Sequence, residues 1–302
     1  MVAVVNVAAR PLKQSRSCHG RLSTDVRTSD GIELHERRWL PESGCRAVVC
    51  LVHGLGEHSG RYPHVGKAFN AHRLGVYAFD LRGHGHSGGR RSHTPGYKNL
   101  LDDIDLLIET ARAEQPGVPL FLYGHSLGGA LVINHVLRRQ PPLAGAIVSA
   151  PALRPGFEPP RWKLAVGRLA AGIWPTLRLA SELDPTAISR DPDVVERYES
   201  DPLMNRSLTA RLGIAAIDEG ERALSEAATL SIPLLLMHGT GDRLTSPEAS
   251  RRFAADAGDL CTLRLFDGLY HELHNEPEKA DVFGCVFDWI DARTASPRAT
   301  AS

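Results

Sequence analysis

The chain has 302 residues, and its 35 lysines and arginines balance its 35 aspartates and glutamates, so we expect no nucleic-acid partner, which would normally require a basic excess. Apolar residues make up 42% of the chain, which is enough for a large core and too many for a disordered protein. No apolar run reaches the roughly 18 residues of a membrane-spanning helix, so none is predicted.

The first 25 residues differ in pattern from the rest of the chain. They open with apolar residues but without a positively charged start, so a signal peptide is not expected. Residues 1–24 then carry four basic side chains and no acidic one. We predict a disordered or loosely ordered tail over 1–25, with an organelle-targeting segment as the alternative, and a second tail over 295–302.

Short apolar segments alternate with helical patterns along the remaining chain. Strands are predicted over 31–40, 47–52, 76–79, 120–123, 146–148, 233–237 and 262–266, and helices over 100–113, 127–139 and 276–292. Apolar strands separated by helices are typical of a parallel sheet covered on both faces. We therefore predict an α/β protein with a mostly parallel, doubly wound sheet, which binds ligands at the carboxyl ends of its strands.

The regular spacing of strands stops between 151 and 228. This segment is helical in pattern and contains several prolines, and apolar residues at 162, 166, 169 and 173 define one face of a helix. We predict a helical cap over 151–228, lying on a core formed by 26–150 and 229–294. The alternative for the apolar face is simple packing against that core.

The five cysteines, at 18, 45, 50, 261 and 285, are odd in number and include no Cys-x-x-Cys pair. This pattern predicts neither a disulfide framework nor a zinc site, and it favours a reducing compartment, so we expect a cytoplasmic protein. His53, His58, His84 and His86 invite a metal interpretation, but His84 and His86 lie in a glycine-rich loop without a carboxylate or cysteine nearby. No metal is expected.

Two segments match Gly-x-Ser-x-Gly, one around Ser126 and one around Ser87. In a nucleophile elbow, a strand ends before the serine and a helix begins after it, so the sharp turn exposes the hydroxyl. Ser126 meets both conditions, because an apolar run precedes it and an almost wholly apolar helical segment follows. The strand before Ser87 has already ended at Asp80, and the residues after it are not helical. We predict Ser126 as a nucleophile.

A serine nucleophile needs a general base, and the base needs an acid to orient it. On this scaffold the acid and the histidine follow the serine in that order. Asp242 follows the strand 233–237, and His271 follows the next strand, so both lie at carboxyl ends. Residues 149–155 contain no acid, Asp267 is expected to cap a turn, and His238 precedes Asp242. His274 remains the alternative to His271.

The oxyanion formed by such a serine needs two backbone N–H donors. The amide of Leu127, the residue after the nucleophile, is one candidate. The second is the amide of Leu55, in the loop that follows the strand 47–52, where Gly54 and Gly56 leave room for it. The Gly54–Ser59 stretch lacks the Gly-Lys-Ser/Thr of a nucleotide-binding loop, so no nucleotide is expected.

Five longer segments together resemble the monoacylglycerol lipase branch of the α/β hydrolases, which is lysophospholipase-like and of the serine aminopeptidase S33 type. They are 53–62, 80–88, 124–129, 238–242 and 270–276, and the resemblance covers about 28–293. It implies the α/β-hydrolase fold, the triad Ser126, Asp242 and His271, and oxyanion donors at Leu55 and Leu127. It also implies polar residues near the leaving alcohol at Glu57, Arg61 and His274, and no cofactor.

The resemblance further implies hydrolysis of a monoacylglycerol to a fatty acid and glycerol through an acyl-enzyme. A lysophospholipase, a thioesterase, a general carboxylesterase or a carbon–carbon bond hydrolase on the same triad are the alternatives, and a receptor that has lost turnover is disfavoured by the complete triad. Trp162 and Ile173, with basic neighbours, are expected to bind substrate and to contact a lipid surface. The same face would also suit a dimer contact, and the oligomeric state is not predicted.

Overall fold

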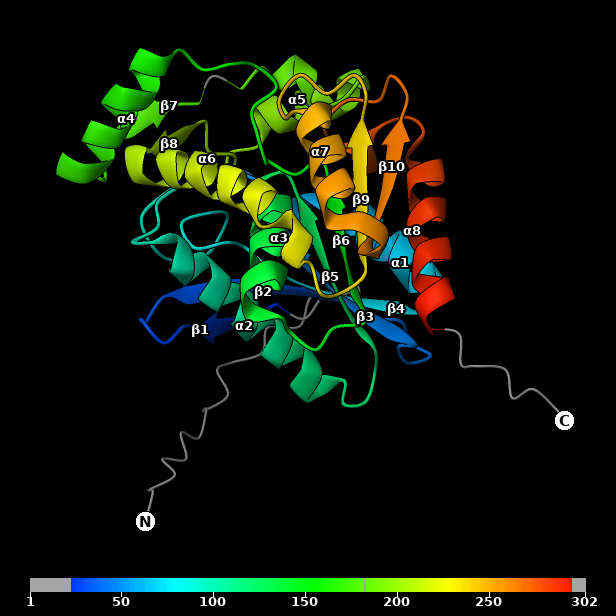
Figure 1. Ribbon diagram of the computed structural model, residues 1–302. Coiled ribbons are helices and arrows are strands. Elements are labelled where there is room, and N and C mark those ends of the chain that lie inside the picture. Colours follow the sequence, from blue (N-terminus) through cyan, green and yellow to red (C-terminus); the bar gives the residue numbers. More distant parts are fainter. Residues whose placement is uncertain (1–22, 182, 295–302) are drawn as a thin grey trace, which may run out of the picture.

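The computed structural model in Figure 1 describes residues 23–181 and 183–294. Within them lies an eight-stranded sheet in the order β1-β2-β4-β3-β5-β6-β9-β10. The strands are β1 (Ser23–Arg27), β2 (Glu33–Trp39), β3 (Ala47–Val52), β4 (Leu74–Phe79), β5 (Leu120–His125), β6 (Gly145–Ser149), β9 (Leu234–Gly239) and β10 (Cys261–Phe266). From β4 to β10 the neighbouring strands are parallel, whereas β2 pairs antiparallel with both β4 and β1. The predicted mostly parallel sheet is confirmed.

The sheet begins earlier than the sequence pattern indicates. Residues 23–25, which we assigned to the tail, pair with β2 as part of β1, so that boundary of the tail was wrong. The physical reason is that β1 is a polar edge strand, held by backbone hydrogen bonds and lacking the apolar alternation of a buried strand. The rest of the predicted N-terminal tail, residues 1–22, and the C-terminal tail over 295–302 lie outside the described residues.

Helices cover both faces of the sheet, and the alternate residues of β3 belong to two hydrophobic cores, one on each face. Its residues Val48, Cys50 and Val52 belong to one core cluster, which also contains residues of the helices α2 (Tyr97–Glu114), α3 (Leu127–Arg139) and α7 (Pro247–Ala257). The alternate residues of β3 pack on the other side with α1 (Pro63–Ala71) and α8 (Lys279–Thr294). All six residues of β3 are buried, which explains why this strand is a continuous apolar run in the sequence.

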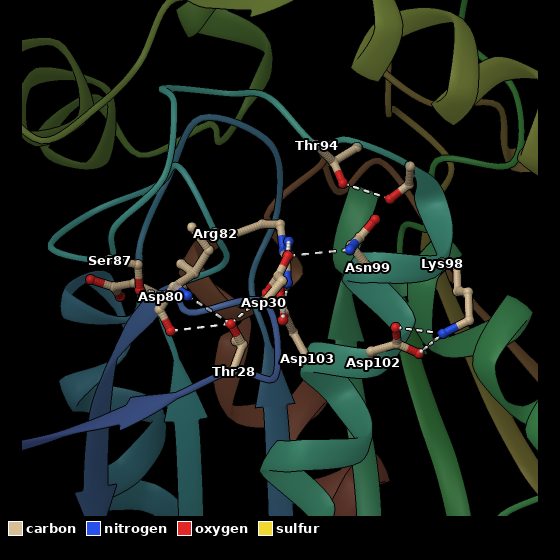
Figure 2. Close-up of polar contacts among 12 residues, drawn as sticks. Thr28, Asp30, Asp80, Arg82, Ser87, Thr94, Lys98, Asn99, Asp102 and Asp103 are labelled. Carbon is tan, nitrogen blue, oxygen red and sulfur yellow. Dashed lines mark hydrogen bonds and ion pairs between the residues drawn. The ribbon is translucent and has the colours of Figure 1, made fainter.

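The loop after β4 is fixed by a polar cluster that Figure 2 shows. Arg82 forms hydrogen bonds of 2.6 Å with both carboxylate oxygens of Asp103 on α2, and its other nitrogen lies 2.7 Å from Asp30. In the same loop, the Ser87 hydroxyl donates to the backbone oxygen of Asp80 and accepts a hydrogen bond from the His35 amide. The hydroxyl of Ser87 therefore supports the loop, which agrees with its rejection as a nucleophile.

The segment between β6 and β9, called the insertion below, lies over the carboxyl ends of the parallel strands (Figure 1). Its elements are α4 (Arg161–Ile173), β7 (Arg178–Ala180), η2 (Pro185–Ala187), α5 (Pro192–Ser200), β8 (Ser207–Thr209), α6 (Ala210–Ser225) and η3 (Ala227–Thr229). β7 and β8 form a small antiparallel pair that the sequence analysis does not anticipate. Thr209 begins α6, because its side chain accepts a hydrogen bond from the Leu212 amide.

The apolar face of α4 is turned away from the rest of the molecule. Trp162, Val166, Leu169 and Ile173 are 66%, 57%, 63% and 76% exposed, so the alternative that this face packs on the core was wrong. No helix in the described ranges has the length and apolar character needed to cross a membrane.

Candidate active site

Ser126 lies on a sharp turn between β5 and α3. Its backbone has φ +55° and ψ −119°, a strained conformation for a residue with a side chain. Three hydrogen bonds hold this turn: the Ser126 amide donates to the Ser149 oxygen, and the Ser126 oxygen accepts from the amides of Ala130 and Ala152. A Cβ on Gly128 would lie 2.2 Å from the Val52 oxygen, so only glycine lets α3 start this close to β3.

Asp242 and His271 follow the adjacent parallel strands β9 and β10 and meet at their carboxyl ends. The His271 Nδ1 lies 2.7 Å from the Asp242 Oδ2, and both side chains are buried. A proton on Nδ1 donated to this carboxylate leaves Nε2 as the acceptor, which is the tautomer a general base needs.

The surroundings of this pair favour charge on both partners. Burial opposes ionisation of Asp242, but the charge of His271 and hydrogen bonds from His238 and His271 outweigh burial and hold the pKa of Asp242 well below its usual range. Burial of His271 likewise disfavours its cation, yet the Asp242 charge and hydrogen bond raise the pKa of His271 above its usual value. The carboxylate is therefore ionised at neutral pH and stabilises an imidazolium.

A cavity of about 350 Å³ opens beside these residues, between the sheet and the insertion. Ser126 and His271 both line it, together with Leu55 and Leu127. The His125 ring, next to Ser126 in the chain, lies 4.7 Å from the His271 ring between centroids. The structure thus brings the predicted nucleophile, base and acid to one site.

The wall of the cavity opposite the sheet comes from the insertion and is largely apolar. Leu164 and Gly167 on α4, Tyr198 on α5, and Ile214 and Ile217 on α6 contribute to it. An elongated apolar group is the ligand that such a wall accommodates.

The loop after β3 is pressed against the nucleophile at Gly54. A Cβ on Gly54 would lie 3.1 Å from the Ser126 Cβ and 2.9 Å from the Glu57 Oε1. The next residue is Leu55, and Leu127 is the first residue of α3. Within the ranges that the structure describes, neither amide has a backbone or side-chain acceptor, which leaves both N–H groups for a ligand oxygen.

Glu57 and Arg61 also line the cavity, and they form a buried ion-pair network with Glu272. Glu57 accepts hydrogen bonds from the Gly54 amide (2.6 Å), the Tyr62 hydroxyl (2.8 Å) and Arg61 (2.8 Å). Burial alone would raise the pKa of Glu57, but the charge of Arg61 together with the nearby histidines His125, His53 and His274 outweighs burial and lowers that pKa. Glu57 is therefore an ionised anchor for the loop that carries Leu55.

Three residues expected at the substrate lie elsewhere. His274 is fully buried behind the cavity wall, where it stacks on Tyr62 at 4.9 Å and meets the His125 ring edge-on. Trp162 and Ile173 point outward, because the opposite face of α4 borders the cavity. These three side chains do not line the cavity. The helical period revealed the two faces of α4 but not which of them faces inward.

Three of the four histidines that invited a metal interpretation have hydrogen-bond partners, and the ring of the fourth, His86, packs edge-on against the His35 ring. His53 Nε2 accepts a hydrogen bond from the Leu81 amide, His58 Nε2 lies 2.9 Å from Asp201, and His84 Nδ1 lies 3.0 Å from the Arg82 oxygen. Across residues 23–181 and 183–294, no group of three or more His, Cys, Asp or Glu side chains is placed to hold a metal ion.

Sequence reasoning missed three residues near the site and set a fourth, His238, aside. Thr245 donates to the Asp242 carboxylate, His238 lies 3.0 Å from the same carboxylate, Glu272 pairs with Arg61, and Tyr198 packs under the Arg61 guanidinium at 5.2 Å. The proximity of Thr245 and His238 to Asp242 in the chain was a usable signal. Tyr198 gave none, because it comes from the insertion.

The sheet order, the strained serine between strand and helix, and the acid and histidine at neighbouring strand ends define an α/β hydrolase. The family model described as serine aminopeptidase, S33, matches residues 43–278. The chain belongs to this family and is a serine hydrolase of the monoacylglycerol lipase type, which confirms the resemblance noted in the sequence.

Relatives from several organisms, and solved structures, are similar to this chain. A monoacylglycerol lipase of Mycolicibacterium smegmatis is 38% identical, over 86% of this chain and 93% of its own length. Phospholipase YtpA of Bacillus subtilis is 31% identical, over 81% of this chain and 95% of its own. The crystal structure of Paleococcus ferrophilus monoacylglycerol lipase is 38% identical, covers 86% of this chain and 99% of its own, and has a TM-score of 0.79. An uncharacterized abhydrolase domain-containing protein of Dictyostelium discoideum is 37% identical over 89% of this chain, but the match spans only 29% of that protein's length.

Proposed function

We propose that this protein hydrolyses carboxylic esters of single-chain lipids, and that a monoacylglycerol is its substrate. The observation that carries the proposal is the hydrogen-bonded pair of Asp242 and His271, which shares with Ser126 a cavity whose outer wall is apolar. The similarity to two monoacylglycerol lipases supports the choice of substrate.

The proposed mechanism uses these groups in turn. His271 Nε2 accepts the hydroxyl proton of Ser126 as the Ser126 oxygen attacks the ester carbonyl. The Leu55 and Leu127 amides stabilise the negative charge that develops on the carbonyl oxygen. His271 then donates its proton to the leaving glycerol oxygen, and an acyl-enzyme remains. Water attacks that ester by the same sequence and releases the fatty acid, while Asp242 stays ionised throughout.

The two ends of the substrate would contact different parts of the cavity. We place the acyl chain along the apolar wall formed by α4 and α6, where burial of each CH₂ contributes about 0.8 kcal/mol. The glycerol end would lie near Glu57 and Arg61, two of the polar residues that line the cavity, and near the hydroxyl of Tyr198.

The exposed face of α4 supports contact with a lipid surface. Four large apolar side chains of α4 are exposed there, and Phe157 (52%) and Leu179 (42%) are both exposed and part of the cavity lining. Arg161, Lys163 and Arg168 are basic residues on the same helix. We infer a cytoplasmic protein whose insertion rests on a membrane surface and receives substrate from it.

A single-chain phospholipid is the second candidate substrate, favoured by the similarity to phospholipase YtpA. The test is a panel of saturated monoacylglycerols of increasing chain length beside one lysophospholipid and one acyl-CoA. We expect the monoacylglycerols to be the best substrates. A tenfold or greater preference for the lysophospholipid or the thioester would refute the assignment.

The role of Ser126 needs its own test. Ser126→Ala should abolish turnover of a medium-chain monoacylglycerol and of a p-nitrophenyl ester, and it should prevent labelling by a fluorophosphonate. Ser87→Ala is the matched control, because Ser87 lies in the competing motif and should leave labelling intact. Unchanged turnover by Ser126→Ala would end the proposal.

A further inference from the structure

The Asp242 carboxylate receives more hydrogen bonds than the histidine of a triad would supply. Its Oδ1 accepts from the amides of Leu244 (2.7 Å) and Thr245 (3.0 Å). Its Oδ2 lies within 2.7 Å of His271 Nδ1, 2.8 Å of Thr245 Oγ1 and 3.0 Å of His238 Nε2. A carboxylate oxygen has two lone pairs, so the donors at Oδ2 compete for it.

The competing histidine is held in a defined orientation. His238 lies on β9 and is fully buried. Its Nδ1 is 2.7 Å from the Ser250 hydroxyl on α7, and its Nε2 faces Asp242. Because the Ser250 hydroxyl is able to donate to Nδ1, the neutral ring carries its proton on Nε2 and donates it to the carboxylate. His238 does not line the cavity, so it acts through Asp242 and through Thr245, whose Oγ1 lies 3.3 Å from both His238 Nε2 and His271 Nδ1.

We propose that His238 is a positioning residue of the triad, which shares Asp242 Oδ2 with His271 and thereby limits how strongly the carboxylate holds the catalytic imidazolium. The inference rests on the proposed function, since it requires Asp242 and His271 to work as acid and base. A chain of Ser250, His238, Asp242 and His271 then links α7 to the base through side chains alone.

Besides Asp242, other charged and titratable groups lie near His271, and they stay in place when His238 is replaced. They are the carboxylates of Glu57 and Glu272 with their partner Arg61, and the His125 ring, whose pKa burial lowers to about 4. Loss of the His238 donor leaves more of the Oδ2 charge for His271. The imidazolium is then held more tightly, so the pKa of His271 should rise further.

The test compares two variants of His238 in the full chain. His238→Gln places an amide N–H near the position of Nε2 and keeps the donor, whereas His238→Leu removes it. The readout is the acid limb of kcat/KM against pH with a p-nitrophenyl ester. We expect the midpoint to move up by about 0.5–1 pH unit in His238→Leu and to stay within about 0.2 unit of the wild type in His238→Gln.

Two outcomes would overturn the proposal. A midpoint that stays in place in His238→Leu, with only a lower melting temperature, would make His238 a purely structural residue. Equal shifts in both variants would show that the donor is not what matters. Ser126→Ala, run beside them, reports separately on the proposed function: if it keeps the wild-type rate, the triad assignment fails whatever the midpoints do.

A measurement on the wild type covers the case in which His238→Leu does not fold. The ¹⁵N spectrum of histidine-labelled protein, with the His238 signal assigned through His238→Gln, reports which ring nitrogen carries the proton. We expect the proton on Nε2 at the pH of full activity. A proton on Nδ1 alone would leave His238 unable to donate to Asp242 and would refute the proposal.

Discussion

The variant Gly54→Ala tests whether the backbone of the loop after β3, rather than its side chains, stabilises the oxyanion. The added Cβ would lie 2.9 Å from Glu57 Oε1 and 3.1 Å from Ser126 Cβ, whereas ordinary contacts begin at 3.4 Å. The added Cβ would therefore be about 0.5 Å too close to Glu57 Oε1 and about 0.3 Å too close to Ser126 Cβ. Glu57 is held by Tyr62 and Arg61, so the loop must move away from the nucleophile instead.

This movement takes the Leu55 amide with it. An oxyanion donor works at about 2.7–3.1 Å, so a retreat of a few tenths of an ångström brings it to the edge of that range or beyond it. Removal of one such donor costs about 2.7–4 kcal/mol, equivalent to roughly 10²–10³-fold in kcat. We expect a fall of about 10²-fold in kcat with little change in KM, measured with a p-nitrophenyl ester and with a monoacylglycerol.

Leu55→Ala is the matched control, since it shortens the neighbouring side chain and leaves the amide in place. Its kcat should fall by less than about tenfold. The reasoning is refuted if Gly54→Ala retains the wild-type kcat, or if Leu55→Ala loses as much activity as Gly54→Ala does. In the second case the Leu55 side chain, and not the backbone, would carry the effect.

Three further predictions concern the charged groups of the site. Asp242→Asn should lower kcat by about 10⁴-fold while the chain still folds, because the amide cannot hold His271 in the required tautomer; circular dichroism beside kinetics checks it, and a loss below tenfold would contradict it. Arg61→Met leaves two buried carboxylates without their partner and should reduce the free energy of unfolding by about 3–5 kcal/mol; urea denaturation measures this, and an unchanged midpoint would mean that the network contributes nothing. The raised pKa of His271 predicts that kcat/KM increases with pH through a midpoint above 6.5, and a midpoint below 6.5 would disagree with the structure. The raised pKa also means that protonation of His271 stabilises the folded state. This contribution to the free energy of unfolding is fully present below pH 6.5 and is lost as the pH rises through the folded-state pKa of His271.

The strands of the sheet could be predicted where both faces are buried. β3 and β9 are continuous apolar runs, since each of their residues contacts one core or the other. β1, β7 and β8 escaped prediction for the opposite reason. They are short or polar strands, held by backbone pairing, which leaves no periodic trace in the side chains.

The candidate site was predictable to the extent that chain order constrains it. Ser126, Asp242 and His271 each follow a parallel strand of the sheet, so the topology alone brings them to one edge of it. The place of Tyr198 depends on how the insertion folds back, and the pairing of Glu272 with Arg61 joins two loops far apart in the chain, so no local pattern specifies either. His238 was set aside because it precedes Asp242, although its position four residues away on the end of β9 places it against the carboxylate.

Glu57 has a consequence for attempts to redesign this protein. Its carboxylate holds the Gly54 amide and at the same time forms part of the cavity wall. A change made there to admit a different alcohol would also loosen the turn that presents Leu55 to the reacting carbonyl. Both the selectivity for the alcohol and kcat therefore depend on the Glu57 side chain. Directed evolution toward new alcohols should succeed first at Tyr198, which lines the same cavity but makes no bond to that turn.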